Sequence, residues 1–453
     1  MTTFPDGFLW GVATSAYQIE GAAQAEGRGA SIWDTFTHKQ GTILNGDTGD
    51  TAADHYHRLD EDLDLLEQLG IQAYRFSIVW PRVQPDGKGE LNGKGVDFYR
   101  RLLDGLAQRG IEPMITLYHW DLPQALEDDG GWLNRDTAQR FADYARRMVE
   151  TFGHLAARWV TLNEPWCSAF LGYYEGRFAP GHRNYDEAYT AVHHLLLAHG
   201  LGLAAIRTEA PDAEVGLTCN LADIAAATPA DSAAAKAADM EENRLFLDPV
   251  FLGRYPADAP DRMRNEQLVR DGDLELISAP LDFFGLNYYI REVVAADDGE
   301  PNRGWRRVPP YGELTSKGDG IAPDGLTNVL QRTQHHYAPG LPIYITESGA
   351  PYNDYVNPEG QVNDPERIEY LAAHFAAASA AIESGVDLRG YFVWSLLDNF
   401  EWDSGYAMRF GIVYVDYLTQ QRIPKSSALW YREVIRANGI PAESDPALAA
   451  PVD

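Results

Sequence analysis

The chain has 453 residues, of which 45% are hydrophobic and 23% are charged, so it can bury a large core. Its 67 Asp and Glu residues outnumber its 37 Lys and Arg residues, which gives a formal net charge of −30 at pH 7. Such an acidic surface repels phosphate backbones and anionic lipid, so we expect neither nucleic acid nor a membrane as a partner. A homo-oligomer is compatible with this composition.

The cysteines and the N-terminal residues bear on the cellular compartment. Cys167 and Cys219 are too few for a disulfide framework in a chain of this length. The first residues lack the basic segment and the unbroken apolar run of a signal peptide. No stretch approaches the roughly 20 apolar residues of a membrane-spanning helix. We therefore expect a cytoplasmic protein with reduced thiols.

Eight short, largely apolar runs recur along the chain. In chain order they cover residues 9–17, 71–80, 111–120, 158–166, 214–220, 281–289, 342–349 and 389–397. Nearly continuous apolar character, rather than strict alternation, is typical of parallel strands that are covered on both faces. Each run therefore predicts one buried parallel strand.

Amphipathic segments separate these runs. In residues 55–70, leucines recur at helical spacing, and Gly70 is a typical helix stop. Residues 96–108, 137–152, 185–208 and 365–383 show the same pattern. A strand and a helix repeated about eight times predict an α/β fold, a single (β/α)8 TIM barrel over residues 1–453. The alternative is a doubly wound open sheet, but its G-x-G-x-x-G motif does not follow the first strand.

Two segments fall outside this repeat. Residues 291–325 are rich in Gly, Pro and charge, and they predict a long loop inserted at the C-terminal face. Long loops in compact domains are often functional, so this one is expected either to be a solvated insertion or to border the substrate cleft. Residues 439–453 predict a loosely held tail.

Several predicted strands end in polar and aromatic residues that a core would not select. These are His119, Trp120 and Asp121 in HWD; Asn163 and Glu164 in TLNEP; Asn287, Tyr288 and Tyr289; Glu347 in ITESG; and Glu401 and Trp402 in LLDNFEW. A single Glu after a strand is more often a solvated loop residue. In a barrel, however, the C-terminal strand ends meet at one mouth, so these side chains are predicted to converge.

Two carboxylates on separate barrel strands are the minimum needed to cleave a glycosidic bond. One protonates the leaving oxygen, while the other attacks the anomeric carbon or activates a water. Carboxyl groups about 5–5.5 Å apart give retention and wider pairs give inversion. The spacing of Glu164 and Glu347 along the chain leaves both outcomes open.

At these motifs the chain resembles the family 1 glycoside hydrolases, the β-glucosidases and β-galactosidases, over essentially its whole length. Matching stretches include FPDGFLWGVATSAYQIEG, YRFSIVWPR, LYHWDLPQAL, TLNEPW, YITESG and WSLLDNFEW. The resemblance implies a retaining reaction without cofactor or metal, in which Glu164 is the acid/base and Glu347 the nucleophile. It also implies these sugar-binding residues: Gln18, His119, Trp120, Asn163, Asn287, Tyr289, Trp394, Glu401 and Trp402.

Other positions are expected to support the reaction. Arg75 and Tyr289 could hold the Glu347 carboxylate in its charged form. Trp166, Cys167 and His182 are expected on the leaving-group side. Ser348 stands where the family usually has Asn, and this departure changes no role. Relatives that take 6-phosphorylated sugars lack the Glu401 carboxylate, so a neutral sugar is favoured.

We therefore expect an exo-acting β-glucosidase that releases terminal β-linked glucose from short oligosaccharides or aryl and alkyl glycosides, as in cellulose degradation. Side activity on β-galactosides or β-fucosides, and transglycosylation by the same site, are the alternatives within this class. A carbohydrate-binding protein with a dead site and a metal-dependent barrel enzyme are the alternatives from other classes. The histidines considered as metal ligands, His55, His57, His193 and His194, lack a compact ligand pattern.

Overall fold

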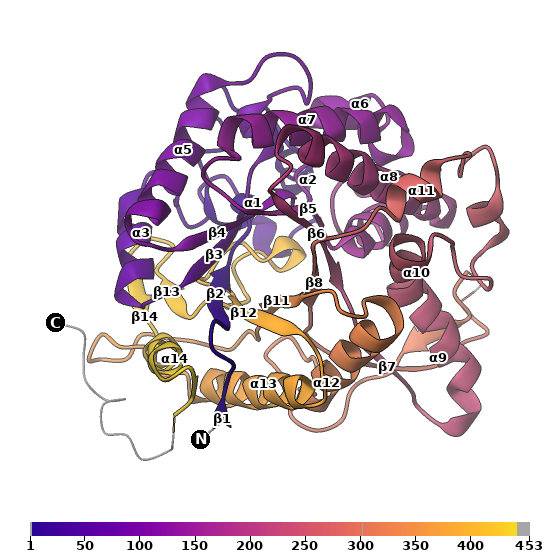
Figure 1. Ribbon diagram of the computed structural model, residues 1–453. Helices are drawn as coiled ribbons and strands as arrows, with labels where there is room; N and C mark the ends of the chain where they lie inside the picture. Colours follow the sequence, from indigo (N-terminus) through magenta and orange to yellow (C-terminus); the bar gives the residue numbers. More distant parts are fainter. Residues whose placement is uncertain (1, 301, 442–453) are drawn as a thin grey trace.

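The computed structural model describes residues 2–300 and 302–441. Its central feature is a closed barrel of eight parallel strands in the order β11-β12-β2-β3-β4-β5-β6-β8. Strand β2 pairs with both β12 and β3, so the first barrel strand of the chain lies beside the last one. Helices surround the strands (Figure 1). The predicted (β/α)8 barrel is therefore confirmed.

The barrel strands coincide with the eight apolar runs. They are β2 (Leu9–Ala13), β3 (Ala73–Ser77), β4 (Glu112–Tyr118), β5 (Arg158–Asn163), β6 (Glu214–Asn220), β8 (Phe283–Asn287), β11 (Ile343–Ser348) and β12 (Leu388–Trp394). Most runs extend beyond their strand, because the polar and aromatic residues at their ends belong to loops and short helices. Side chains such as Met114, Val160 and Phe392 form a buried cluster from several of these strands, so the barrel is packed rather than open.

All five predicted helices are present. They are α3 (Leu59–Gln68), α5 (Gly93–Gln108), α7 (Asp136–Phe152), α8 (Tyr185–Glu209) and α13 (Pro365–Glu383). The structure adds α9 (Ser232–Asp239), α10 (Leu245–Leu252), α11 (Asp273–Ile277), α12 (Pro323–Arg332) and α14 (Ser426–Ala437), and the short helices α1 (Ala16–Ile19), α2 (Ile32–Thr37), α4 (Trp80–Val83) and α6 (Gln124–Asp128). The 3₁₀ and π segments are η1 (Leu44–Gly46), η2 (Gly131–Leu133), η3 (Cys167–Tyr174), η4 (Pro229–Asp231), η5 (Met240–Arg244), η6 (Asp261–Arg264), η7 (Thr333–Tyr337) and η8 (Trp402–Ser404).

Helix α8 is more apolar than we expect for any segment of this chain. By length and composition alone it could cross a membrane, so the expectation that no stretch approaches this size is wrong for α8. Its most apolar 18-residue window is 78% buried, and it packs against α7 and η3. Burial on this scale is typical of a core helix.

Residues 291–325 are not the structureless loop that was predicted. Strands β9 (Arg291–Ala296) and β10 (Trp305–Arg307) pair antiparallel, and β9 pairs parallel with β7 (Asp223–Ala226). This small sheet lies outside the barrel, and α9 packs against it (Figure 1). The alternating burial of REVVAA supports a strand, but the segment is short and its neighbours are rich in Gly, Pro and charge.

The chain end described by the structure is also more ordered than predicted. Gly439 and Ile440 form β15, which pairs antiparallel with β1 (Thr2–Thr3). The Trp10 indole donates a hydrogen bond of 2.9 Å to Asn438 Oδ1 just before β15. The loose tail therefore does not begin at residue 439, and residues 442–453 of the prediction lie outside the described residues. The remaining pair is β13 (Val413–Val415) with β14 (Arg422–Pro424).

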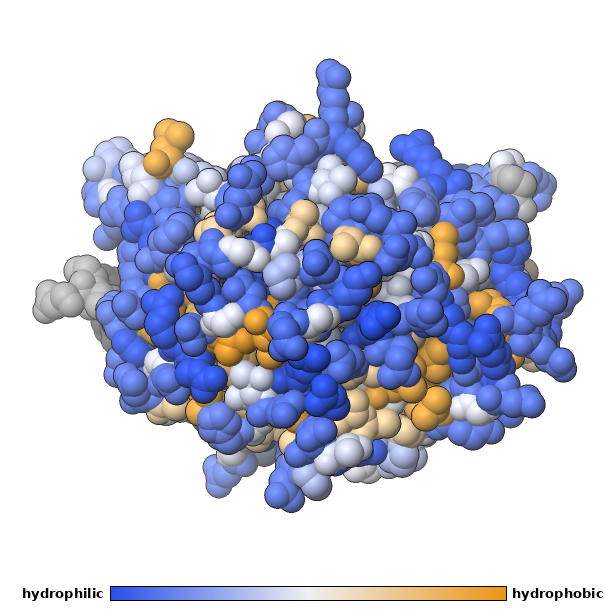
Figure 2. Space-filling view, turned by 90° about the horizontal axis from the view of Figure 1, so that it is seen from above, coloured by the Kyte–Doolittle hydropathy of each residue, from blue (hydrophilic) through white to orange (hydrophobic). Residues whose placement is uncertain are grey.

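The face of the molecule in Figure 2 is mostly hydrophilic, and its hydrophobic residues lie in several small groups. This distribution agrees with the large share of charged residues in the chain. A possible homo-oligomer stays a prediction.

Candidate active site

A cavity of about 370 Å³ opens at the C-terminal ends of the barrel strands. This volume falls within the range of small-molecule sites, about 300–1,000 Å³. Most of the predicted site residues line it: His119, Trp120, Glu164, Trp166, Cys167, Asn287, Tyr289, Glu347, Trp394, Glu401 and Trp402. The convergence that was predicted from the strand ends is therefore observed.

A second cavity, of about 410 Å³, lies at the opposite end of the barrel. Four of its charged side chains are paired, Arg158 with Glu112 and Arg389 with Asp387. Barrel enzymes place their chemistry at the C-terminal face. We therefore assign the chemistry to the first cavity.

Glu347, near the end of β11, is held by two donors. Arg75 Nη1 donates a hydrogen bond of 2.5 Å to its Oε1, and the Tyr289 hydroxyl donates one of 2.7 Å to its Oε2. Glu347 and Arg75 are both buried. Charge-assisted hydrogen bonds of this kind stabilise an ionised carboxylate, so the surroundings of Glu347 suit a nucleophile.

Glu164, directly after β5, has different surroundings. Asn287 Nδ2 donates a hydrogen bond of 2.6 Å to its Oε1, and the Cys167 thiol donates one of 3.1 Å to its Oε2. Burial, followed by the nearby charge of Glu347, raises the pKa of Glu164 to about 7. A carboxyl group with this pKa can be protonated near neutral pH, as a general acid requires.

Asn163 links the two glutamates. Its Oδ1 accepts hydrogen bonds from Arg75 Nη2 at 2.7 Å and from Asn287 Nδ2 at 3.1 Å. Because Arg75 also contacts Glu347 and Asn287 also contacts Glu164, one continuous chain of hydrogen bonds joins both carboxylates. Asn163 is fully buried and does not line the cavity, so its predicted contact with a sugar stays a prediction.

His119 lines the cavity, and its contact with Asn163 fixes which ring nitrogen carries the proton. Its Nε2 lies 3.0 Å from Asn163 Nδ2, and because an amide nitrogen only donates, Nε2 accepts and Nδ1 carries the proton. Burial and, after it, the charge of Arg75 hold the pKa of His119 well below its usual value, so the ring is neutral. Within residues 2–300 and 302–441, His119 Nδ1 has no hydrogen-bond partner.

Three residues of the site hold a left-handed backbone conformation. The φ angle is 78° at Trp120, 47° at Glu164 and 47° at Trp402. Such angles cost about 1–3 kcal/mol each in a non-glycine residue and persist only where the surroundings enforce them. Three residues that line the cavity thus have a strained backbone.

Gln18 supports Glu401 from behind. Its Nε2 donates to Glu401 Oε2 at 3.2 Å and to the Phe400 carbonyl at 2.9 Å, and its Oε1 accepts from the Ser15 hydroxyl at 2.6 Å. Burial raises the pKa of Glu401 to about 7, although Lys317 opposes this shift. Gln18 does not line the cavity, so its predicted contact with a sugar stays a prediction.

Aromatic rings form one wall of the cavity. The ring centroids of Trp120 and Trp402 lie 4.5 Å apart. The His119 ring lies nearly parallel to those of Trp394 and Trp402, at 6.0 and 6.1 Å. Flat apolar faces of this kind suit the C–H-rich faces of a sugar ring.

The predicted leaving-group residues are only partly brought together. Trp166 and Cys167 line the cavity, but His182 does not. Its Nδ1 lies 2.8 Å from Glu187 Oε2, and its Nε2 lies 3.4 Å from Glu127 Oε1. These two carboxylates hold the His182 ring, and its predicted place on the leaving-group side stays a prediction.

Ser348 points away from the site. Side chains alternate along a strand, so the neighbour of an inward Glu347 faces outward. Ser348 is fully buried, lies beside Tyr370 and Tyr391, and does not line the cavity. Its effect on Glu347 is therefore indirect.

The histidines considered as metal ligands have structural contacts. His55 Nδ1 lies 2.7 Å from Asp62, and His193 lies between Tyr255 and Asp273 at 2.9 Å from each. In the part of the chain that the structure describes, no three His, Cys, Asp or Glu side chains are grouped to hold a metal ion.

Several residues of the cavity were missed by the sequence analysis. They include Asn220, Glu242, Glu292, Arg307 and Lys317. Asn220 ends strand β6, so the rule applied to the other strand ends could have found it. Glu292 and Arg307 lie in the segment predicted as a loop, and no sequence signal marks Glu242.

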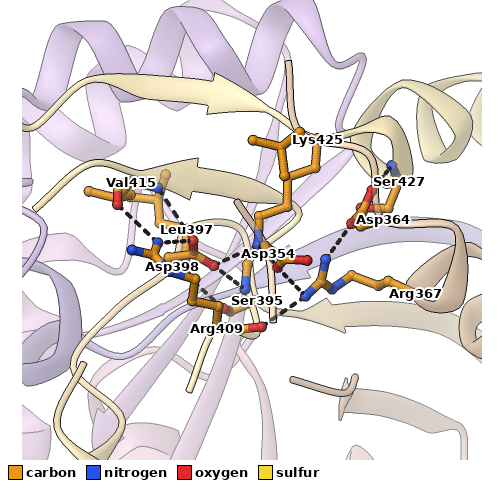
Figure 3. Close-up of polar contacts among 12 residues, drawn as sticks. Asp354, Asp364, Arg367, Ser395, Leu397, Asp398, Arg409, Val415, Lys425 and Ser427 are labelled. Atoms are coloured by element: carbon orange, nitrogen blue, oxygen red, sulfur yellow. Dashed lines mark hydrogen bonds and ion pairs between the residues drawn. The ribbon is translucent and has the colours of Figure 1, made fainter. Parts of the chain in front are cut away.

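A network of buried charges supports the loop that carries Glu401 (Figure 3). Asp398, which precedes Glu401 by three residues, accepts from Lys425 Nζ at 2.7 Å and from Arg409 Nη1 at 2.5 Å. Lys425 also donates to Asp354, at 2.5 Å. The network continues through Arg367, Asp364 and Ser427 to the starts of α13 and α14. The loops that follow β11 and β12 are thus tied together.

Comparison with known proteins agrees with this site. Residues 1–440 match the model of glycosyl hydrolase family 1. A protein of Thermotoga neapolitana named 1,4-beta-D-glucan glucohydrolase is 47% identical over 448 residues, which cover 97% of this chain and 100% of the relative. A protein of Bifidobacterium breve named bifunctional beta-D-glucosidase/beta-D-fucosidase is 46% identical over 457 residues, covering 95% of this chain and 98% of the relative.

Solved structures indicate the same family. A structure described as a family 1 β-glucosidase from Thermotoga maritima superimposes with a TM-score of 0.95 at 45% sequence identity. The match covers 98% of this chain and 100% of that one. The family match spans both glutamates and every other predicted site residue. The chain therefore belongs to glycosyl hydrolase family 1.

Proposed function

We propose that this protein is an exo-acting, retaining β-glucosidase that releases terminal β-linked glucose through a covalent glycosyl-enzyme intermediate. The observation that carries the proposal is the contrast between two carboxyl groups in one cavity. Glu347 is held by a guanidinium and a hydroxyl, whereas burial and the charge of Glu347 raise the pKa of Glu164 to about 7.

The first step uses both side chains. Glu347 Oε attacks the anomeric carbon, and Glu164 donates its proton to the leaving oxygen as the glycosidic bond breaks. Arg75 and Tyr289 hold the attacking carboxylate in place through their hydrogen bonds until it forms the ester. The leaving group departs with the proton of Glu164.

The second step reverses the role of Glu164. Once Glu347 is an ester it carries no charge, so the like-charge repulsion that raises the pKa of Glu164 disappears. Glu164 is then ionised and removes a proton from the incoming water, which attacks the anomeric carbon. Glucose leaves with its β configuration, and both side chains return to their first state.

The proposal extends to the substrate and the compartment. Names of relatives support glucosides, including β-glucan fragments of the kind released from cellulose, with fucosides as a side activity. Buried, free Cys167 and Cys219 support a reducing compartment such as the cytoplasm.

The decisive test combines turnover with stereochemistry. Purified protein is assayed on 4-nitrophenyl β-glucoside, β-galactoside and β-fucoside, and the first anomer released is observed by NMR. We expect the highest kcat/KM for the glucoside and the β-anomer as first product. No turnover, or the α-anomer first, would overturn the proposal.

A further inference from the structure

The thiol of Cys167 contacts the carboxyl group of the proposed acid/base. Its Sγ donates a hydrogen bond of 3.1 Å to Glu164 Oε2. Both residues line the cavity, and both are buried. A buried acceptor depends on the donors around it, because water does not replace a donor that is lost. Neither step of the proposed reaction uses this contact.

The local course of the chain places the thiol at this carboxyl group. Glu164 follows β5 with a φ angle of 47°, and a helical segment begins at Pro165. The backbone N–H of Cys167 donates to the Glu164 carbonyl at 3.0 Å, which closes the first turn of this segment. Side chains three residues apart in a helical turn lie on the same face. The order Glu-Pro-Trp-Cys therefore brings the thiol beside the carboxyl group.

The two carboxyl oxygens of Glu164 have different partners. Asn287 Nδ2 donates to Oε1 at 2.6 Å. Because an amide nitrogen only donates, this contact favours an unprotonated Oε1 and leaves the transferable proton on Oε2. Cys167 contacts Oε2. The thiol thus lies at the oxygen that releases a proton to the leaving group and takes one from water.

The Cys167 thiol acts as a donor and not as an acceptor in this contact. Burial, followed by the charge of Glu164, raises the pKa of the Cys167 thiol well above its usual value. Sγ therefore keeps its proton near neutral pH. A donor that points at a carboxyl oxygen stabilises the ionised form of the carboxyl group.

Cys167 is one of several groups that control the charge of Glu164. Burial, followed by the charge of Glu347, raises the pKa of Glu164. The hydrogen bonds from Asn287 and Cys167 oppose this rise, so loss of the thiol is expected to raise the pKa of Glu164 further. The other titratable groups that face Glu164 come from β3, β6, β11 and the residues after β8, and they are Arg75, Cys219, Glu347 and Tyr289.

We propose that Cys167 is a positioning residue for the acid/base, and that its S–H group holds the proton-transferring oxygen of Glu164 and stabilises the carboxylate left when the proton departs. The inference rests on the proposed β-glucosidase function and adds a residue to its mechanism. In the first step the S–H hydrogen bond strengthens as Glu164 becomes charged, because a charged acceptor binds a donor more strongly than a neutral one. In the second step the bond weakens again as Oε2 takes the proton of water.

The test follows how kcat/KM for octyl β-glucoside depends on pH. An alkyl leaving group needs the proton of Glu164, so the decline at alkaline pH reports the pKa of this acid in the free enzyme. Cys167→Ala removes the donor, and the alkaline decline is expected to move up by about 0.5–1 pH unit, the size of a weak hydrogen bond to a charged group. Cys167→Ser keeps a donor and is expected to return the decline to the wild-type pH or below it.

Cys219→Ala is the matched control. Cys219 in β6 is equally buried, and the charge of Glu164 acts on its thiol too. Among the residues that the structure describes, however, Glu164 accepts side-chain hydrogen bonds from Asn287 and Cys167, not from Cys219. The alkaline decline is therefore expected to stay that of the wild type. An unchanged decline in Cys167→Ala, or an equal shift in Cys219→Ala, overturns the inference. If Cys167→Ala fails to fold, Cys167→Val takes its place with the same expected shift.

A direct titration separates this inference from the proposed function. NMR of ¹³C-labelled glutamate measures the pKa of Glu164 without turnover, and this pKa is expected to rise in Cys167→Ala. Equal pKa values of Glu164 in the wild type and in Cys167→Ala overturn the inference even in an active enzyme. Absence of wild-type turnover on the glucoside instead contradicts the proposed function.

Discussion

Glu164 and Glu347 carry the same chemical group, yet the fold gives them opposite tasks. Glu347 contacts a guanidinium and a phenol hydroxyl, whereas Glu164 contacts an amide and a thiol. A cation beside a carboxylate favours its charged form, and burial beside a like charge favours the neutral form. At the scale of the residue, the neighbours and not the side chain decide which glutamate attacks and which protonates.

Replacing the nucleophile tests this assignment. Glu347→Ala is expected to lower kcat by at least about 10⁴-fold, because no covalent intermediate can form. Added azide is expected to restore turnover of an activated aryl glucoside and to give the α-glycosyl azide, since azide attacks from the face that Glu347 vacated. Substantial turnover without azide would contradict the nucleophile role.

Replacing the acid should discriminate between leaving groups. Glu164→Ala is expected to lower kcat/KM strongly for alkyl glucosides and much less for dinitrophenyl glucoside, because only a poor leaving group needs a proton. The slope of log kcat/KM against the pKa of the leaving group measures this difference. A slope equal to that of the wild type would speak against an acid role.

The effect of the Glu347 charge on the pKa of Glu164 can be measured directly by titration. Glu347→Gln removes the charge that, together with burial, raises the pKa of Glu164 to about 7 in the wild type. The pKa of Glu164 is therefore expected to fall in this variant, as followed by NMR of ¹³C-labelled glutamate. Since the acid must be protonated, wild-type kcat/KM is expected to decline as the pH rises above about 7. A pKa of Glu164 that is unaltered by Glu347→Gln would leave burial as the whole cause.

At the scale of elements, the loop after β12 depends on charges that lie far from it in sequence. Asp398 is fully buried three residues before Glu401, and Lys425, just ahead of α14, holds it together with Asp354 (Figure 3). Removing Lys425 would leave Asp398 with Arg409 and Asp354 with Arg367, so two buried carboxylates would each lose one cation. The same contacts that stabilise the fold therefore also place Glu401 in the cavity.

Lys425→Met tests this element. It leaves Asp354 and Asp398 buried without their shared cation, so the free energy of unfolding is expected to fall by about 3–5 kcal/mol. KM for glucosides is expected to rise more than kcat falls, because Glu401 loses its fixed position while Glu164 and Glu347 keep theirs. Urea unfolding and steady-state kinetics measure both effects.

Arg389→Gln is the control for Lys425→Met. Arg389 pairs with Asp387 at an exposed site beside the second cavity, and such pairs contribute about 1 kcal/mol or less. We expect a near wild-type KM for this variant. Equal changes in the two variants would show that the buried network does not position the loop.

At the scale of the whole molecule, buried titratable groups predict how stability depends on pH. The pKa is raised to about 7 in Asp121, Glu164 and Glu401 and to about 8 in Glu242, in each case mainly by burial. Such carboxyl groups stabilise the fold while protonated, and this contribution is lost as the pH rises through these values. Burial lowers the pKa of five histidines, His119, His193, His194, His199 and His374. These rings stay neutral in the folded protein, so the fold loses stability as the pH falls below their usual pKa of 6.5.

The carboxyl groups favour stability at lower pH, whereas the histidines favour stability at higher pH. We therefore expect the free energy of unfolding to be greatest near about pH 6 and to decline between about pH 6.5 and 8.5. Urea unfolding at a series of pH values measures this dependence. Asp121→Asn removes one of the raised carboxyl groups and is expected to flatten the alkaline decline. Stability that increases steadily up to pH 8.5 would show that these carboxyl groups do not control it.

Much of this molecule could be predicted from local patterns. Continuous apolar runs mark all eight barrel strands, because a strand covered on both faces must be apolar throughout. The polar ends of those runs predicted which residues meet at the cavity, because the strands of a barrel are parallel and end at one mouth. The prediction was wrong where the local signal was short, as for β9 and β10 in the segment predicted as a loop.

The sequence by itself determined the barrel, the family and the positions of the two glutamates, because each depends on periodicity or on motifs of adjacent residues. Only the tertiary structure decided their environments. The contacts of Arg75 with Glu347 and of Lys425 with Asp398 join residues from different strands and helices, and Glu242 meets Arg307 only because a small sheet folds beside the barrel mouth. Burial and the distance between charges set pKa values and specificity, and both arise only when distant segments pack together.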